Sequence, residues 1–152
     1  MTSNDYLRRL GNTNLMVSPI GLGAMQFSGG KGMFRFFLSK LPTETMDETL
    51  LAALESGINW IDTAEIYGGG ESERAVAHAL KAAGKASGEV VITTKWSPIL
   101  RRAKSILKSA RNSTQRLDPY PIDLYLVHQP WSLSSLEAQM NTMADLVDSG
   151  LV

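Results

Sequence analysis

Four apolar segments, each followed by a stretch with helical periodicity, constrain the fold of this chain more than any other feature of its sequence. The segments are continuous apolar runs, as expected of strands in a parallel sheet that is covered on both faces. Four consecutive strand–helix units predict an α/β fold, in which right-handed connections roll the units in one direction. The predicted strands are residues 17–22, 58–61, 90–94 and 122–127.

Capping residues and glycines predict where the helices begin and end. Thr45 with Glu48, and Ser134 with Glu137, have the spacing of a capping box at a helix N-terminus. A glycine just after a periodic stretch typically ends a helix. The predicted helices run from Thr45 to a stop at Gly57, from Ser72 to near Gly84, from about Leu100 to Leu117, and from Ser134 to about Asp148 before Gly150.

The region before the first helix holds one further element. Turn-forming residues at 10–15 lie between short apolar segments and predict a β-hairpin ahead of the first strand. A long loop, residues 24–44, is expected to join the first strand to the first helix.

The length of the chain limits how many such units it can hold. Its 152 residues suffice for one domain with a real core, but a complete eight-stranded (β/α) barrel has roughly 250 residues. Four units correspond to half of a barrel of the TIM type, so we expect residues 1–152 to form part of one domain, with no second domain. Both edges of a half barrel would be open, and an open apolar edge can pair with another chain, so self-association is a further expectation.

The composition argues against several classes of function. The 15 basic and 15 acidic side chains give a net charge of zero, which offers no basis for binding nucleic acid. The chain has no cysteine, and its two histidines, His78 and His128, are isolated, so no metal site is expected. The N-terminus lacks the apolar core of a signal peptide and no segment has the length of a membrane span, so we expect a cytoplasmic protein without a membrane partner.

Polar side chains occur at the ends of three successive predicted strands. Asp62 and Tyr67 belong to the stretch DTAEIYG that follows the second strand, Lys95 follows the third, and His128 follows the fourth. In a parallel α/β barrel these strand ends converge on one pocket, where polar groups are typical of catalysis. A single lysine or histidine after a strand is more often solvated or structural. The conjunction of all four predicts an active site.

In order and spacing, these four residues resemble the catalytic tetrad of the aldo-keto reductase family. Nearly the whole chain is similar to the N-terminal half of such an enzyme, most clearly at residues 10–23, 57–64 and 122–130. The resemblance implies the first four units of a (β/α)8 barrel after an N-terminal hairpin. It also implies NADPH-dependent reduction of aldehydes or ketones to alcohols, with a small carbonyl compound as substrate.

The resemblance also implies a role for each member of the tetrad. Tyr67 would donate a proton to the carbonyl oxygen, and Lys95 would lower the pKa of that phenol. Asp62 would hold Lys95 charged and in place. His128 would position the carbonyl through a ring N–H.

Only part of the family's cofactor site carries over to this sequence. The family binds NADPH mainly through residues after its fifth and seventh strands, which lie beyond the region of resemblance. The positions that match near the nicotinamide are Gly23, Met25 and Asp62. We therefore expect the 152-residue chain by itself to show no NADPH-dependent carbonyl reduction and to behave as a truncated member of the family.

Aromatic residues near the same strand ends suggest a substrate pocket. Trp96 follows Lys95 directly, and Trp131 lies three residues after His128. The segment 33–37, which is rich in phenylalanine, follows the first strand. Lining of an apolar pocket and an aromatic cluster that closes the barrel explain these residues about equally well.

Two alternatives stay open. Potassium-channel β subunits resemble the same family and keep the tetrad, so a noncatalytic regulatory or interaction subunit is a second reading, and an inactive fragment is a third.

Basic residues on the third predicted helix are interpreted as a solvated face and not as an anion site. They are Arg101, Arg102, Lys104, Lys108, Arg111 and Arg116.

Overall fold

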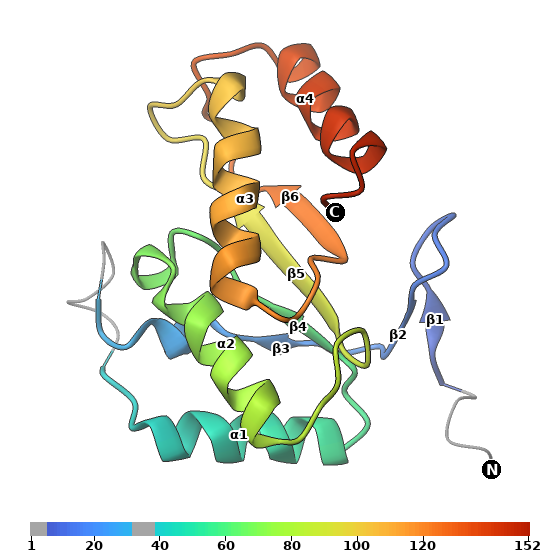
Figure 1. Ribbon diagram of the computed structural model, residues 1–152, viewed down its shortest axis with the longest axis vertical. Helices are drawn as coiled ribbons and strands as arrows, with labels where there is room; N and C mark the ends of the chain where they lie inside the picture. The colour runs from blue at the N-terminus through green and yellow to red at the C-terminus, as the bar shows by residue number, and fades with distance from the viewer. Residues whose placement is uncertain (1–5, 32–38) are drawn as a thin grey trace.

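A parallel four-stranded sheet forms the centre of the computed structural model, which describes residues 6–31 and 39–152 (Figure 1). The strands lie side by side in the order in which they occur in the chain, and each neighbouring pair is parallel. The predicted α/β class is therefore confirmed. The strands of this sheet are β3 (Leu22–Gly23), β4 (Trp60–Asp62), β5 (Val91–Trp96) and β6 (Leu124–Val127).

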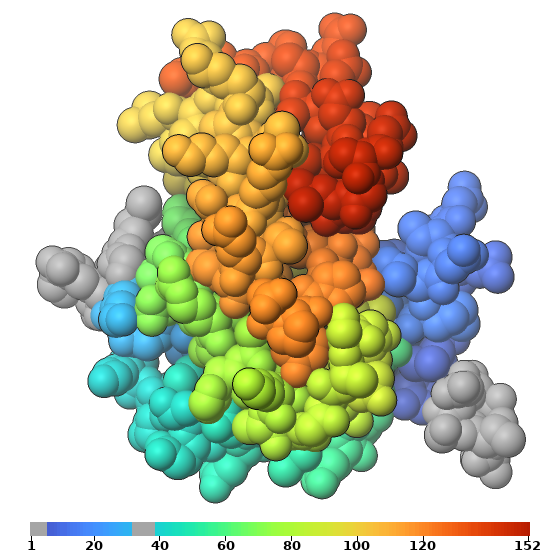
Figure 2. Space-filling model, in the orientation of Figure 1, coloured from blue at the N-terminus to red at the C-terminus, as the bar shows by residue number. Residues whose placement is uncertain are grey.

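A helix follows each strand of the sheet, and short 3-10 helices precede three of these helices in the connecting loops. In the space-filling view the helices form the visible face of the molecule (Figure 2). Within the described residues, no helix combines the length and hydrophobicity needed to cross a membrane. The helices are α1 (Thr43–Glu55), α2 (Glu71–Ala82), α3 (Ile106–Leu117) and α4 (Leu136–Asp148), with η1 (Met25–Ser28), η2 (Tyr67–Gly69) and η3 (Ala103–Ser105).

The predicted hairpin is present. Strands β1 (Arg8–Arg9) and β2 (Met16–Val17) pair antiparallel, and Leu10 N donates to Leu15 O at 2.9 Å across the turn. The hairpin lies to one side of the helices in Figures 1 and 2.

The predicted first strand, residues 17–22, is wrong in its bounds. Val17 belongs to the hairpin, and the sheet strand β3 begins only at Leu22. Between them the chain turns at Ser18 and Pro19, where Ser18 Oγ donates to Ile20 O at 2.7 Å. Proline has no N–H to offer a strand ladder, so the apolar run is interrupted there.

Two predicted helix starts are also wrong. Helix α1 begins at Thr43 with Pro42 in the N-cap position, so Thr45 lies inside the helix and makes no cap. Helix α3 begins at Ile106 and not near Leu100, which has a φ of 55°, in the left-handed region that interrupts a helix.

The remaining helix boundaries deviate by one residue or agree. Helix α2 begins at Glu71, one residue before Ser72. Ser135, and not Ser134, caps α4, since its Oγ accepts from Ala138 N at 3.2 Å. The hydroxyl of Ser134, the predicted cap, accepts instead from Ala103 N at 3.0 Å. Ser134 therefore makes a tertiary contact and does not cap the helix. The predicted glycine stops of α1, α2 and α4 are confirmed, with φ of 88° at Gly57, 66° at Gly84 and 68° at Gly150.

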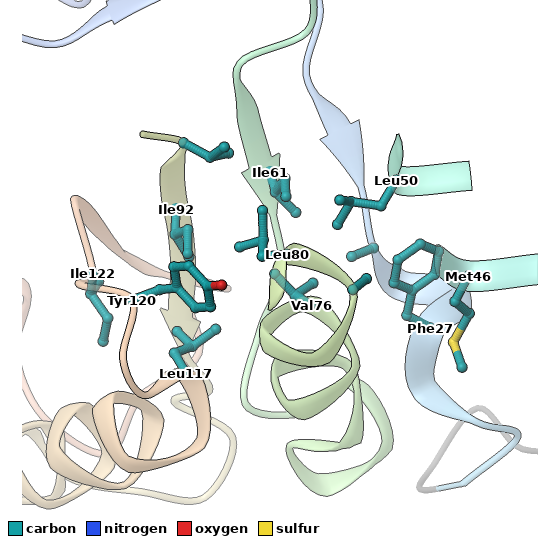
Figure 3. Close-up of a cluster of buried hydrophobic side chains, with 13 residues drawn as sticks. Phe27, Met46, Leu50, Ile61, Val76, Leu80, Ile92, Leu117, Tyr120 and Ile122 are labelled. Atoms are coloured by element: carbon teal, nitrogen blue, oxygen red, sulfur yellow. The ribbon is translucent and has the colours of Figure 1, made fainter. Parts of the chain in front are cut away.

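Alternation along the strands sends side chains to two faces of the sheet. Ile61 and Ile92 point toward the helices and pack against Leu50 of α1 and Leu80 of α2, all four fully buried (Figure 3). Trp96 belongs to a second buried cluster with residues of α3 and α4. We call this helix-covered side the outer face. Because successive strand residues alternate in direction, Asp62, Thr93 and Lys95 belong to the opposite, inner face.

Candidate active site

The four predicted catalytic residues lie at one end of the sheet. Asp62 is the last residue of β4, and Tyr67 opens η2 in the loop that follows. Lys95 is the next-to-last residue of β5, which continues through Trp96 instead of ending at residue 94 as predicted. His128 comes directly after β6. Since these strands are parallel, their C-terminal ends bring all four residues to the same edge.

Asp62 and Lys95 form an ion pair between neighbouring strands. Lys95 Nζ lies 2.7 Å from Asp62 Oδ1 and donates to Thr63 O at 2.9 Å. Asp62 is opposite Thr93 in the strand register, so Lys95, two residues farther along β5, is on the same face. The ammonium is therefore held by two oxygens from β4 and its loop.

Tyr67 and His128 meet beside this ion pair. Tyr67 Oη lies 3.5 Å from His128 Nε2, and the two rings are edge to face with centroids 5.4 Å apart. Lys95 Nζ lies 5.3 Å from the centroid of the Tyr67 ring. One oxygen atom of a ligand can thus lie within hydrogen-bond distance of both Tyr67 Oη and His128 Nε2.

The site shifts the proton affinities of both ring side chains. Burial raises the pKa of Tyr67 above its ordinary value, and the nearby Asp62 carboxylate raises it further. Burial lowers the pKa of His128, as does the Lys95 ammonium, while Asp62 and Glu65 oppose these effects. At neutral pH the phenol is therefore protonated and the imidazole neutral.

The net shift of the Tyr67 pKa is upward, so the expected lowering of this pKa by Lys95 stays a prediction. The ammonium favours the phenolate, but it is paired with Asp62 at 2.7 Å, and its effect on the pKa is outweighed. The Asp62 carboxylate and burial both disfavour the phenolate, and these effects prevail.

Local contacts explain how the loop between β4 and α2 presents Tyr67. Thr63 N donates to Thr93 O at 2.9 Å, and Tyr67 N donates to Ala64 O at 3.0 Å. The loop then turns through Gly68, whose φ is 66° and where a Cβ would collide with the carbonyl of Ser28. The glycine run after Tyr67 is thus a steric requirement of this turn.

Two hydroxyl groups behind the site were not predicted from the sequence. Thr63 Oγ1 and Ser72 Oγ are 2.8 Å apart, and Ser72 Oγ donates to Ala24 O at 2.5 Å. Both side chains are fully buried, so they connect the end of β3, the end of β4 and the first turn of α2. The sequence features that could have predicted this contact are Thr63, inside the DTAEIYG stretch, and Ser72, at the predicted start of the next helix.

Two arginines that were assigned to a solvated helix face have other environments. Arg101 lies in the loop after β5 and pairs with Glu65 at 2.6 Å. Arg116 pairs with Glu73 at 2.5 Å, and Glu73 is fully buried. The solvated-face interpretation is therefore wrong for these two residues.

The positions expected to contact a cofactor lie beside Asp62. Gly23 ends β3 directly opposite Asp62, and Ala24 N donates to Asp62 O at 2.8 Å. A Cβ added at Gly23 would meet no described atom within 4 Å, so the space beside the Asp62 carboxylate is open. Met25 follows at the start of η1 and is half-buried. An open space next to the tetrad is compatible with the nicotinamide end of a dinucleotide.

Trp96 does not line a substrate pocket. It is fully buried, and its Nε1 donates to Ser105 Oγ at 3.0 Å on the outer face. Lys95 and Trp96 are consecutive in β5 and so point to opposite faces. Trp131 is 70% exposed in the loop after β6, and its place in a pocket stays a prediction. The segment 33–37 lies outside the described residues.

An apolar pocket of about 310 Å³ occupies the inner face of the sheet below the ion pair. The hairpin contributes to its wall together with the three longer strands. Within the described part of the chain, no three His, Cys, Asp or Glu side chains cluster in a way that would hold a metal ion. The pocket is lined by Leu10, Val17, Trp60, Asp62, Val91, Thr93, Lys95, Leu124 and Leu126.

Comparisons with known proteins agree on one family. The family profile described as Aldo/keto reductase family matches residues 19–152. "Aldo-keto reductase YhdN" of Bacillus subtilis is 35% identical over 151 residues, which cover 94% of this chain and 44% of that protein. The crystal structure of the thermostable aldo-keto reductase Tm1743 with the inhibitor epalrestat superposes with a TM-score of 0.80 at 33% identity, over 95% of this chain and 50% of that one.

A further structure bears on the cofactor. An aldo/keto reductase from Klebsiella pneumoniae in complex with NADP and acetate has a TM-score of 0.74 and 26% identity, over 95% of this chain and 46% of that one. The chain thus spans about half the length of the relatives that it matches.

Proposed function

Because the chain belongs to the aldo/keto reductase family, we propose that it carries the catalytic tetrad of an oxidoreductase that uses NADPH to reduce aldehydes or ketones to alcohols. The observation that carries this proposal is the approach of Tyr67 Oη to His128 Nε2, at 3.5 Å, beside the Asp62–Lys95 ion pair. The NADP complex of the Klebsiella pneumoniae relative supports the choice of cofactor.

Tyr67 and His128 act on the carbonyl oxygen. That oxygen binds between Tyr67 Oη and His128 Nε2, which orients the carbonyl and polarises it. Tyr67, protonated at neutral pH because burial and Asp62 raise its pKa, delivers its proton as negative charge develops on the oxygen. Neutral His128 donates a hydrogen bond from Nε2 and keeps its own proton. NADPH, when bound, supplies the hydride for this reduction.

Lys95 acts after the proton has left. Its ammonium, 5.3 Å from the Tyr67 ring centroid, stabilises the phenolate that proton transfer creates. Asp62 Oδ1 and Thr63 O hold the ammonium in place at 2.7 Å and 2.9 Å. Gly23, Met25 and Asp62 would hold the nicotinamide end of the cofactor, and Trp131 would face the substrate.

The architecture is proposed to be the first four units of one (β/α)8 barrel domain. The parallel sheet, the helices on its outer face and the pocket on its inner face support this reading. In the described residues, β3 and β6 each pair with one strand of the sheet, so both edges have unpaired backbone groups. Association of the chain through these edges is checked by light scattering over a concentration series.

The function is tested with two proteins. One is the purified chain. The other is a hybrid protein, in which this chain is joined to the C-terminal part of the Bacillus subtilis relative, because the chain covers 44% of that relative. Consumption of NADPH with a panel of aldehydes and ketones gives turnover, and fluorescence titration gives cofactor affinity.

Replacement of Tyr67 by phenylalanine removes the proposed proton donor. Tyr67→Phe is expected to lower turnover of the hybrid protein by roughly 10²- to 10⁴-fold and to leave cofactor affinity nearly unchanged. Tyr125→Phe is the matched control, since the Tyr125 hydroxyl is buried outside the tetrad without a hydrogen-bond partner among the described residues. Near-normal turnover by Tyr67→Phe would reject the donor role. Tight cofactor binding without any turnover would favour a noncatalytic subunit.

A further inference from the structure

Arg101 contacts the three loops that follow β4, β5 and β6. Its Nη1 donates to Glu65 Oε1 at 2.6 Å, in the loop that carries Tyr67. The same Nη1 donates to Ser97 O at 3.2 Å, in the loop after β5. Its backbone carbonyl accepts from Leu133 N at 2.9 Å and from Ser132 Oγ at 3.1 Å, in the loop that begins with His128. One residue therefore connects the segments that carry the proposed catalytic groups.

Glu65 completes the connection on the side of Tyr67. It lies two residues before Tyr67, and its backbone N donates to Lys95 O at 3.3 Å. Its Oε1 accepts from Ser97 N at 2.7 Å as well as from Arg101. Bonds to a charged acceptor are stronger than those between neutral groups, and the Glu65 side chain is only 14% exposed. The start of the Tyr67 loop is thus fixed to the end of β5.

The guanidinium group of Arg101 is itself held from several directions. Nη2 donates to Ser109 Oγ on α3, and the guanidinium carbon lies 5.8 Å from the Trp96 ring centroid. A guanidinium can bond Glu65 and Ser109 at once through different nitrogens, whereas a lysine ammonium is a single point charge. The arrangement therefore depends on arginine and not only on a positive charge.

We propose that Arg101, through Glu65, is a positioning residue that sets the separation of Tyr67 and His128. This inference rests on the proposed function, because the separation matters for catalysis only if both rings bind one carbonyl oxygen. Arg101 touches none of the reacting atoms in this role. Its side chain restrains the loop after β4, and its backbone carbonyl holds the loop after β6, relative to the end of β5.

The second arginine–glutamate pair supplies a control. Arg116 Nε donates to Glu73 Oε2 at 2.5 Å, and Thr94 Oγ1 donates to Glu73 Oε1 at 2.6 Å. This pair joins α2 to α3 and, through Thr94, to β5. Its hydrogen bonds reach neither His128 nor residues 62–69, and Arg116 packs against Gly70 at the far end of the Tyr67 loop. A variant that breaks it should lower stability while the Arg101–Glu65 bonds to the start of the Tyr67 loop remain.

The kinetic test uses the hybrid protein. Arg101→Gln is expected to lower kcat by roughly 10²-fold, as for a misplacement of about 1 Å, with KM for the carbonyl and cofactor affinity little changed. Arg101→Lys should recover part of the loss. Glu65→Gln should resemble Arg101→Gln, and the double variant should lose no more than either single variant. Arg116→Gln should lower the midpoint of urea unfolding at least as far while kcat stays within about twofold of normal.

A second readout uses the chain itself and does not depend on activity. Aromatic NMR spectra of the 152-residue chain report the surroundings of the Tyr67 and His128 rings. Arg101→Gln and Glu65→Gln should shift both sets of signals, and Arg116→Gln should leave them in place. If Arg101→Gln does not fold, Arg101→Lys and Glu65→Gln decide the matter.

The outcomes separate this inference from the proposed function. Equal losses of kcat in Arg101→Gln and Arg116→Gln, or unchanged ring signals in Arg101→Gln and Glu65→Gln, would overturn the positioning role. If Tyr67→Phe keeps normal turnover, the proposed function fails on its own, while the ring signals still decide whether Arg101 fixes the two side chains.

Discussion

The two faces of the sheet differ in what their side chains do. On the outer face, Ile61, Ile92 and Trp96 are fully buried against the helices. On the inner face, Asp62 and Lys95 form the centre of the candidate active site, and Leu126 is 37% exposed. Because neighbours in one strand point to opposite faces, stability and chemistry are assigned to alternate residues of the same short segments. Substitutions on the two faces should therefore have separable effects.

The largest loss of stability is expected from the buried ion pair on the helix side. Arg116→Gln leaves the fully buried Glu73 carboxylate without its cation, which should lower the free energy of unfolding by about 3–5 kcal/mol. Urea unfolding of the chain measures the change. Arg102→Gln is the matched control, because its bond to Leu133 O is long, at 3.4 Å, and exposed. A loss no larger than that of the control would mean that Glu73 does not depend on Arg116.

An apolar residue of the outer face should come next. Ile92→Ala removes a fully buried side chain from the contact with α2, and the expected loss is about 2–5 kcal/mol by the same measurement. Leu126→Ala on the inner face removes a side chain that is already 37% exposed and should change stability by about 1 kcal/mol or less. Equal losses at the two positions would contradict the division of the sheet into two faces.

On the inner face the ion pair should matter little for stability and much for activity. Lys95→Met leaves Asp62, whose side chain is 32% exposed, in contact with solvent, so the loss of stability should be about 1 kcal/mol. Turnover of the hybrid protein should nevertheless collapse, and the alkaline limb of its pH profile should move. An unchanged profile and rate would return Lys95 to the status of an ordinary polar residue at a strand end.

The smallest expected effect is the dependence of stability on pH. Since folding lowers the pKa of His128, the unfolded chain binds the proton more readily, and stability should fall as the pH drops below about 6.5. Since folding raises the pKa of Tyr67, the unfolded chain loses its proton first, and stability should also fall as the pH rises above about 10.

Urea unfolding at a series of pH values measures both effects. His128→Gln should flatten the acid slope between about pH 7 and 5. Tyr67→Phe should reduce only its own share of the alkaline slope, because Tyr120 and Tyr125 have pKa values raised in the same direction. An acid slope that persists in His128→Gln would assign it to other groups.

The sequence predicted which polar residues come together at the strand ends better than it predicted their surroundings. Asp62, Lys95 and His128 could be placed together because residue type and position after a strand are both visible in the sequence. The motif that contains Tyr67 added the loop after β4. These signals are local, and parallel strands convert local position into proximity.

The direction of Trp96 and the start of the first strand could not be predicted in the same way. A continuous apolar run does not show which residues face the helices, so the end of β5 and the outward direction of Trp96 were missed. Val17 is as apolar as a core strand residue, but the turn at Pro19 assigns it to the hairpin.

Tertiary contacts decided the remaining differences. Ser134 and Ser135 are both suitable caps, and the bond from Ala103 N to Ser134 Oγ leaves Ser135 to cap α4. Arg101 lies in a basic segment that is typical of a solvated helix, and only the folded chain brings it to Glu65. The two contacts join residues that are 31 and 36 positions apart in the chain, and a single sequence contains no pattern that predicts such contacts.

The apolar pocket on the inner face has a consequence for how such a protein can diverge. Its wall includes Leu124 and Leu126, which lie next to the tetrad yet outside the helix-packed core. Within the proposed (β/α)8 barrel, these leucines would face an interior that side chains fill in layers, so a change at either position would need a matching change on the facing strands. Such a protein would therefore diverge in a concerted way on this face, and more independently on the helix-covered face, where the described helices complete the core.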